Sequence, residues 1–162
     1  MPVTHKYRTV AFGVGVVAVT VIATYVLWGA GGPAEPAYRL RPDDTRFTAM
    51  GQRVYAAQCA ACHGAGLEGQ PNWRERGPDG RLPAPPHDAS GHTWHHPDEL
   101  LFRITKHGVA KAANLKDYVS AMPAYDGVLS DAEIVAALSW IKAQWPAYIR
   151  VRHDELNRAS SR

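Results

Sequence analysis

Five consecutive residues, Cys59-Ala60-Ala61-Cys62-His63, restrict the structures open to this chain more strongly than any other stretch. The two cysteines in them are the only two in the sequence. Two thiols at this spacing can form thioethers with the two vinyl groups of a haem, while the imidazole that follows binds the iron. The pattern therefore predicts one covalent haem c, attached to Cys59 and Cys62 and ligated by His63.

Three other uses of a Cys-x-x-Cys pair are a structural disulfide, a redox-active thiol pair and one half of a zinc site. A zinc site would need a second Cys or His pair at a characteristic spacing, and thiol redox chemistry would need a βαβ context. The sequence offers neither of them. Haem attachment is therefore the preferred interpretation.

The N-terminal part contains an apolar run from Val10 to Trp28 without a charged side chain. In a helix, at ~1.5 Å per residue, such a run can cross the roughly 30 Å hydrocarbon core of a bilayer. Basic flanks stay in the cytoplasm, and the residues before the run include His5, Lys6 and Arg8. We therefore expect a cytoplasmic segment (1–9), a single transmembrane anchor (10–28) in the inner, or plasma, membrane, and a remainder that faces the periplasm.

A cleaved signal peptide is the alternative, with Ala30-Gly31-Gly32 as a possible cleavage site. The length of the run favours the anchor, as do Tyr25 and Trp28 at its outer end, because aromatic residues prefer the membrane interface. Both interpretations export the rest of the chain.

The charge balance bears on the class of partner. The chain has 18 basic and 15 acidic residues, and with Lys6 and Arg8 before the anchor the exported part is close to neutral. A surface of this kind lacks the positive field that attracts nucleic acid. We predict no nucleic-acid partner.

Residues 29–43 are rich in glycine and proline, which predicts an extended linker between the anchor and a folded domain over 44–146. The domain begins with a helix for which Asp44 and Thr45 are candidate N-caps. Its small and apolar residues follow helical spacing up to Cys59.

The rest of the domain alternates irregular and helical stretches. The segment from Gly64 to His96 contains too many prolines and glycines for a helix or a central strand, and so predicts a long loop that could wrap a cofactor. A helix is expected from Pro97 to Gly108, and another from a Ser130–Glu133 capping box to Pro146. The polar, basic tail (147–162) is expected to be frayed. No alternating strand pattern is found, so the domain is predicted to be all-α.

Over residues 45–146 the sequence resembles the class I cytochrome c family. Gly51, Tyr55 and Cys59 repeat the spacing on that family's first helix, where the small residue lets the first and last helices cross closely. Trp140 is similar to the aromatic partner on the last helix. The resemblance implies a cytochrome c fold with three to five helices around one haem, here preceded by a transmembrane helix.

In that family the second iron ligand is a methionine followed by proline, shortly before the C-terminal helix, and Met122-Pro123 is similar in sequence and position. The other methionines are poorly placed, because Met1 precedes the anchor and Met50 lies on the predicted first helix, close to Cys59. We therefore expect Met122 to bind the iron. In the alternative, Met122 fills a gap in the core and a histidine takes the sixth position.

The resemblance also implies that a proline carbonyl accepts a hydrogen bond from the axial histidine, within a Pro-x-Leu element. The nearest match is Pro85-Pro86-His87, in which His87 replaces the leucine, and we assign the role to Pro85. Guanidinium or indole groups of the long loop are candidates for binding haem propionates, and we name Arg81 and Trp94. Trp73 and Arg74 lie in the same loop, and for all four the alternative is a surface role.

His92, His95 and His96 could bind a second metal, since imidazoles suit copper and zinc. Apart from Asp98, no carboxylate or thiol joins them. A polar turn that leads into the helix at Pro97 is the preferred interpretation.

Together these features predict electron transfer between donor and acceptor complexes of a respiratory or other redox chain. No motif for substrate catalysis is present, so an electron carrier is expected rather than an enzyme. The alternatives are a haem subunit of a redox enzyme complex, or a small-molecule-binding haem enzyme or sensor in which the Met122 ligand is labile.

Overall fold

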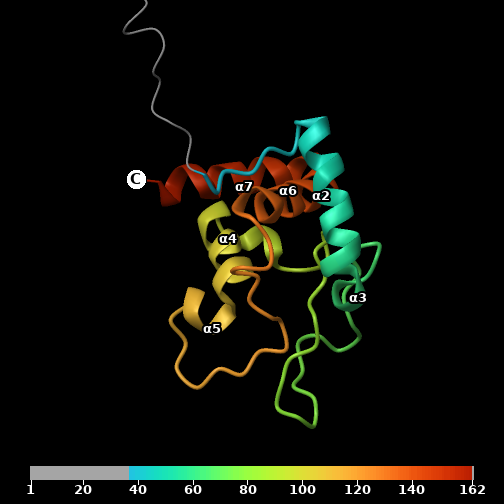
Figure 1. Cartoon of the computed structure of the whole chain (residues 1–162), viewed down its shortest axis with the longest axis vertical. Coiled ribbons are helices and arrows are strands. Elements are labelled where there is room, and N and C mark those ends of the chain that lie inside the picture. The colour runs from blue at the N-terminus through green and yellow to red at the C-terminus, as the bar shows by residue number, and fades with distance from the viewer. Residues whose placement is uncertain (1–36, 162) are drawn as a thin grey trace, which may run out of the picture. The chain divides into compact units, whose positions relative to one another are not determined.

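The computed structural model describes residues 37–161. The predicted cytoplasmic segment, the anchor and the first part of the linker lie outside this range. Within it every regular element is helical and no strand is present, which confirms the all-α prediction. In chain order the helices are α2 (Thr45–Gln58), α3 (Ala60–His63), the 3₁₀ helix η1 (Thr93–His95), α4 (Asp98–His107), α5 (Val109–Ala112), α6 (Asp131–Ala143) and α7 (Ala147–Ser160) (Figure 1).

None of the helices formed by residues 37–161 is both long and apolar enough to cross a bilayer.

Helix α2 begins where the sequence predicted. The Asp44 side chain accepts a hydrogen bond from the backbone N–H of Phe47, which satisfies one of the free donors of the first turn. At its other end, the backbone N–H of Cys59 donates to Tyr55. The two cysteines and His63 therefore follow directly from a well-capped helix.

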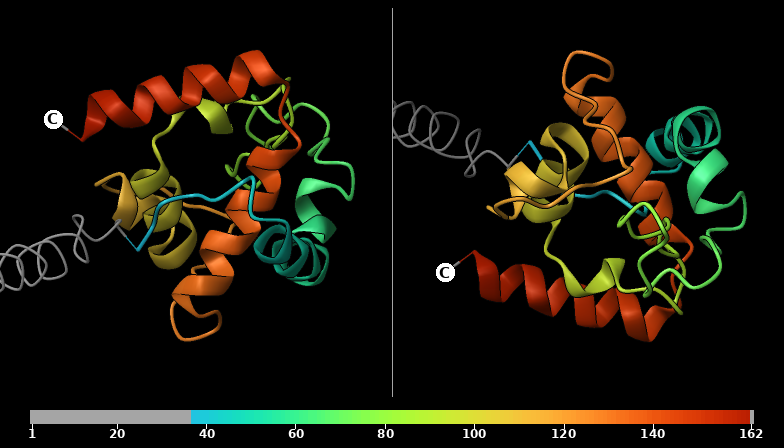
Figure 2. Two further views of the ribbon diagram at one scale, coloured as in Figure 1. Left: turned by 90° about the horizontal axis from the view of Figure 1, so that it is seen from above. Right: turned by 90° about the horizontal axis from the view of Figure 1, so that it is seen from below.

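Helix α6 forms the centre of the core. The predicted capping box is present: the Ser130 hydroxyl accepts from the backbone of Glu133, whose carboxylate accepts from the backbone of Ser130. The helix is buried nearly all round, over Ile134, Val135, Ala136, Ala137, Leu138, Ser139, Ile141 and Lys142. Burial on all sides requires neighbours on all sides: α2 and α4 lie beside this helix, and α7 adds contacts near its C-terminal end (Figure 2).

Helices α2 and α6 cross at very close range. A Cβ atom on Gly51 would lie 1.9 Å from the carbonyl oxygen of Ala136, so only glycine fits at this crossing. Beside it the rings of Tyr55 and Trp140 pack at 4.7 Å between centroids. The close crossing and the aromatic pair are both as the resemblance predicted.

Helix α4 begins after Pro97, as expected, and ends at Gly108. The preceding segment, 64–92, is irregular, which confirms the predicted loop. Backbone hydrogen bonds nevertheless fold it onto itself, including Gln70 N–H to Ala84 (2.9 Å) and His87 N–H to Leu67 (2.8 Å). The loop is therefore fixed at its base while its tip extends away from the helices (Figure 1).

The prediction of a frayed C-terminal tail is wrong. Residues 147–160 form α7, in which Ile149 and His153 are fully buried. Lys142 of α6 forms an ion pair with Asp154 of α7. This helix was not predicted because its inner face is partly polar, and the polar side chains on it pair with residues that are distant in the chain.

The folded domain also begins earlier than predicted, within the segment assigned to the linker. Leu40 is buried in the core, and its backbone N–H donates to the carboxylate of Asp98 at 2.9 Å. The backbone N–H of Arg41 donates to the Ser139 hydroxyl at 2.8 Å. The residues from Leu40 onward therefore belong to the domain.

Candidate cofactor site

The Cys59-to-His63 segment forms one tight turn of helix at the end of α2. The backbone N–H of His63 donates to the Cys59 carbonyl at 2.9 Å, and Gly64 ends the turn with φ +81°. Cys59 is half-buried and Cys62 is exposed, and neither is in a disulfide. Both thiols are thus available for attachment.

Burial, together with the neighbouring Cys62, raises the pKa of the Cys59 thiol to about 11. At neutral pH this thiol stays protonated, whereas redox exchange and zinc binding both use the thiolate. Over residues 37–161, moreover, no group of three or more Cys, His, Asp or Glu side chains is placed to hold a metal ion. The disulfide, redox and zinc alternatives therefore gain no support.

The buried imidazole of His63 is held by Pro85. Its Nδ1 lies 2.8 Å from the Pro85 carbonyl oxygen, and since a carbonyl only accepts, Nδ1 carries the proton. Burial lowers the pKa of His63, so the ring is neutral and Nε2 keeps a lone pair for a metal. This is the hydrogen bond that the sequence assigned to Pro85.

The proline segment is itself tightly packed. A Cβ atom on Gly91 would lie 2.0 Å from the Pro86 carbonyl oxygen, so the chain passes Pro86 at backbone contact. The next residue, His87, stacks on His63 with ring centroids 4.0 Å apart. Burial, with His63 and His92 nearby, holds the pKa of His87 well below its usual range.

Met122 lies in the loop between α5 and α6, half-buried against the core. Tyr125 fastens this loop to the end of α2, because its hydroxyl donates to the Gln58 carbonyl at 2.7 Å. Its backbone N–H also donates to Thr105 of α4 at 3.1 Å. The structure thus holds the loop that carries Met122 next to the segment that carries Cys59.

Trp94, in η1, has a buried indole Nε1–H without a hydrogen-bond partner among the described residues. A buried donor left unpaired costs about 1–3 kcal/mol, so such an atom points to an acceptor from outside the chain. The Arg152 guanidinium of α7 lies 5.2 Å from the centroid of the Trp94 ring. An acidic group such as a haem propionate fits this donor and the charge beside it.

Arg81 gains no comparable support. Its side chain is exposed on the long loop and makes no hydrogen bond or ion pair within residues 37–161. Its backbone N–H donates to Asp79 at 3.1 Å, and its carbonyl accepts from Gly77 at 2.9 Å. The contacts of Arg81 therefore shape the loop tip, and its role toward a propionate stays a prediction.

The three clustered histidines pack against aromatic rings. His92 stacks on Trp73 at 5.2 Å and meets His96 edge-on at 5.3 Å, while His95 stacks on Trp94 at 3.7 Å. Arg74 covers the ring of Trp73 at 4.1 Å. These rings lie in the turn that leads into α4, and within residues 37–161 no group of three or more His, Cys, Asp or Glu side chains is placed to hold a metal ion.

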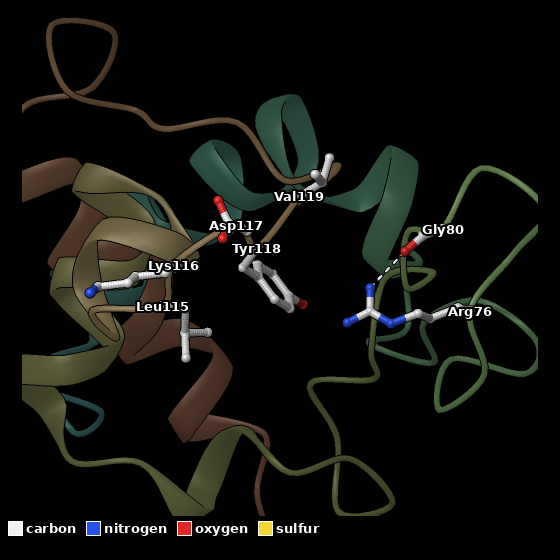
Figure 3. Close-up of a pocket in the computed structure, with 7 residues that line it drawn as sticks. All are labelled: Arg76, Gly80, Leu115, Lys116, Asp117, Tyr118 and Val119. Atoms are coloured by element: carbon white, nitrogen blue, oxygen red, sulfur yellow. Dashed lines mark hydrogen bonds between the residues drawn. The ribbon is translucent and has the colours of Figure 1, made fainter.

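A pocket of about 390 Å³ opens where the tip of the long loop approaches the segment before Met122. In Figure 3 the Arg76 guanidinium and the Tyr118 ring face each other across it, 5.6 Å apart, and Arg76 donates to the Gly80 carbonyl at 2.6 Å. Leu115, Lys116, Asp117 and Val119 complete the lining. The sequence analysis did not single out Arg76 or Tyr118, because neither stands in a recognisable motif.

In a comparison with protein families, the model described as "Cytochrome C oxidase, cbb3-type, subunit III" matches residues 47–141. The match includes the cysteine pair, His63 and Met122. Comparisons with curated proteins and with solved structures give no match.

Proposed function

The chain belongs to the cytochrome c family described as cytochrome C oxidase, cbb3-type, subunit III, and on this premise we propose that it is a membrane-tethered electron carrier with a His63/Met122-ligated haem. As a mono-haem c-type cytochrome it holds one covalent haem c and serves haem-based electron transfer. The bound haem supplies one-electron chemistry at its iron. The protein supplies the ligands, the burial and the surface for its partners.

The observation that carries the proposed ligation is the hydrogen bond between His63 Nδ1 and the Pro85 carbonyl. It fixes the tautomer in which Nε2 can bind iron, and an acceptor of this kind also raises the basicity of the ligand. Cys59 and Cys62 attach the group on the same turn. The tautomer of the axial histidine is thus fixed independently of the second ligand.

Met122 is the proposed second ligand. Its thioether lies half-buried against the core, in a loop that the Tyr125 hydroxyl fastens to Gln58 at the end of α2. Histidine and methionine together raise the reduction potential of a c-type haem. The carrier is therefore suited to accept electrons from a quinol-side donor and to pass them to an oxidase or reductase.

The haem edge requires donors for its propionates, and Trp94 is the proposed one. Its buried indole N–H lacks a partner in the described part of the chain, and Arg152 adds positive charge beside its ring. A propionate accepting this hydrogen bond would satisfy the donor. Arg81 remains a second, weaker candidate from the sequence.

The tether and its location belong to the same proposal. The uncharged run from Val10 to Trp28 is long enough to anchor the chain in the inner membrane, with the haem domain in the periplasm. The proposed partners are the donor and acceptor complexes of that membrane. If residues 1–28 form the anchor, the full chain sediments with membranes and a chain that lacks these residues does not. Equal solubility of the two chains would refute the anchor.

A second candidate is a permanent haem subunit of an oxidase complex, which the family description itself favours. Affinity purification of the tagged full chain from gently solubilised membranes separates the two. A stoichiometric set of membrane subunits would establish the fixed subunit, and recovery of the chain alone would favour the mobile carrier.

The ligation is tested by absorption spectra of the oxidised and reduced haem protein, with and without carbon monoxide. We expect a six-coordinate low-spin haem that ignores carbon monoxide in the unmodified chain and in Met50→Ala, but binds it in Met122→Ala. Rapid carbon monoxide binding by the unmodified chain would mean an open iron site, and would place a small-molecule-binding enzyme or sensor ahead of the carrier.

A further inference from the structure

The ring of His87 lies flat against the ring of His63. Their centroids are 4.0 Å apart, and their planes differ by 20°. The resemblance that supplies Pro85 would place a leucine at this position, so the imidazole is a feature of this chain rather than of the general pattern. A flat ring here calls for a reason beyond filling space.

His87 is fixed at three points. Its backbone N–H donates to Leu67 at 2.8 Å, and its carbonyl accepts from the indole of Trp145 at 2.7 Å. A 2.7 Å hydrogen bond joins its Nδ1 to the hydroxyl of Thr93. These partners come from the long loop, the link between α6 and α7, and η1, so the backbone of His87 is held at two points and its ring at a third.

The Pro85 hydrogen bond alone does not fix the rotation of the His63 ring. It fixes the position of Nδ1 but only weakly fixes the rotation of the ring about the line from Nδ1 to the carbonyl oxygen. The outer torsion of a histidine side chain is broad, so the rotamer does not fix this angle either. A rigid, flat neighbour on the face of the ring removes that freedom.

We propose that His87 is a positioning residue, which fixes the plane of the His63 imidazole and so the orientation of the axial ligand at the iron. The inference rests on the proposed function, in which His63 is that ligand. Leucine would fill similar space, but it has neither a flat face nor a group to bond Thr93. Phenylalanine keeps the flat face and loses only the hydrogen bond.

The test compares haem-loaded full-length chains carrying His87→Leu, His87→Phe and His87→Gln, with His95→Leu as the matched control. His95 is exposed and stacks on Trp94 rather than on His63. Electron paramagnetic resonance of the ferric haem reports the orientation of the axial imidazole, and a redox titration reports the potential. Neither signal responds to a loss of stability alone.

We expect His87→Leu to shift and broaden the low-spin signal and to change the potential, while His87→Phe and the control match the unmodified chain. An unchanged signal in His87→Leu, or an equal shift in His87→Phe, would overturn the inference. If His87→Leu takes up no haem, His87→Gln decides, because glutamine has no ring but keeps a group that can bond Thr93; a shifted signal there supports the inference, and an unshifted one overturns it. Absence of a low-spin haem in the unmodified chain would instead refute the proposed function.

Discussion

Replacement of Gly51 by alanine tests the close crossing of α2 and α6. The added Cβ would lie 1.9 Å from the Ala136 carbonyl oxygen and 3.0 Å from the Ala137 nitrogen. Both neighbours are backbone atoms, so no side-chain rotation can relieve the contact and the helices have to separate. We expect Gly51→Ala to destabilise the domain.

The size of the effect follows from two opposing contributions. Overpacking of a tight core costs about 1–3 kcal/mol, and a Cβ atom that clashes with the backbone of the neighbouring helix belongs at the upper end of this range. Alanine is favoured over glycine inside a helix by about 1 kcal/mol, which offsets part of that cost. The net loss is about 2 kcal/mol, or a fall in melting temperature of roughly 6–12 °C for a domain of this size.

Urea unfolding of the haem-loaded domain, followed by far-ultraviolet circular dichroism, measures this loss directly. Gly66→Ala is the matched control, because its added Cβ would meet only the flexible Glu68 side chain, at 3.2 Å. A Gly51→Ala protein as stable as the control, or more stable than the unmodified domain, would refute the close crossing.

Three further outcomes are expected. Tyr125→Phe removes the hydroxyl that donates to Gln58, and should lower the free energy of unfolding by about 1 kcal/mol in urea titrations. Trp94→Phe removes the buried indole donor and should change the reduction potential in a redox titration, because the proposed propionate loses its hydrogen bond. Burial, with Lys142 nearby, lowers the pKa of His153 below its usual 6.5, so the free energy of unfolding should decrease as the pH falls below about 6.5. His153→Gln should make this decrease smaller in urea titrations at several pH values.

The sign of the pH effect follows from the hydrogen bonds of His153. Its Nε2 lies 2.9 Å from the His96 carbonyl oxygen and so donates, while Nδ1 accepts from Asn157 at 3.3 Å. Protonation of Nδ1 would set two donors against each other. The unfolded chain therefore takes up the proton more readily than the folded one, and acid favours unfolding.

Each of these outcomes has a clear contradiction. Tyr148→Phe is the control for Tyr125, because Tyr148 is 71% exposed; an equal effect in both would show that the Tyr125 hydrogen bond does not hold the loop. A Trp94→Phe protein with unchanged potential and higher stability would mean that the indole donor is unpaired in the haem protein too. If the free energy of unfolding of His153→Gln depends on pH as that of the unmodified chain does, His153 is not the cause of the acid effect.

The predicted helices α2, α4 and α6 were accessible because their signals are local. An N-cap at Asp44, a proline at residue 97 and the Ser130–Glu133 box all act within a single turn. The crossing of α2 with α6 was expected from the resemblance to the class I cytochrome c family, whose spacing on the first helix Gly51, Tyr55 and Cys59 repeat, and the structure has it at Gly51. Local chemistry was therefore sufficient for the helical frame of the domain.

Helix α7 was missed because its stability depends on distant partners. His153 and Asn157 look like surface residues, yet His153 bonds the His96 carbonyl, and Asn157 exchanges hydrogen bonds with Asp98 at 2.8 and 3.0 Å. The same Asp98 carboxylate holds Leu40, which is why the start of the domain was also misplaced. A single sequence gives no sign of which polar side chains will be paired at such separations.

The candidate site divides in the same way. The attachment motif and its histidine are contiguous in the chain, so the sequence alone was enough to propose them. The unpaired indole of Trp94 and the stacking of His87 on His63 depend on how the long loop folds back on the helices. These contacts are visible only once the loop has a structure.

The central claim is that Cys59 and Cys62 hold a haem covalently, and the intact mass of the purified, denatured chain tests it most directly. With the chain produced in a host that attaches haem, we predict the mass of the polypeptide plus one haem, retained after acid and organic solvent and lost from the Cys59→Ser/Cys62→Ser double variant. A mass equal to the bare polypeptide, or two hydrogens below it as a disulfide requires, would contradict the account.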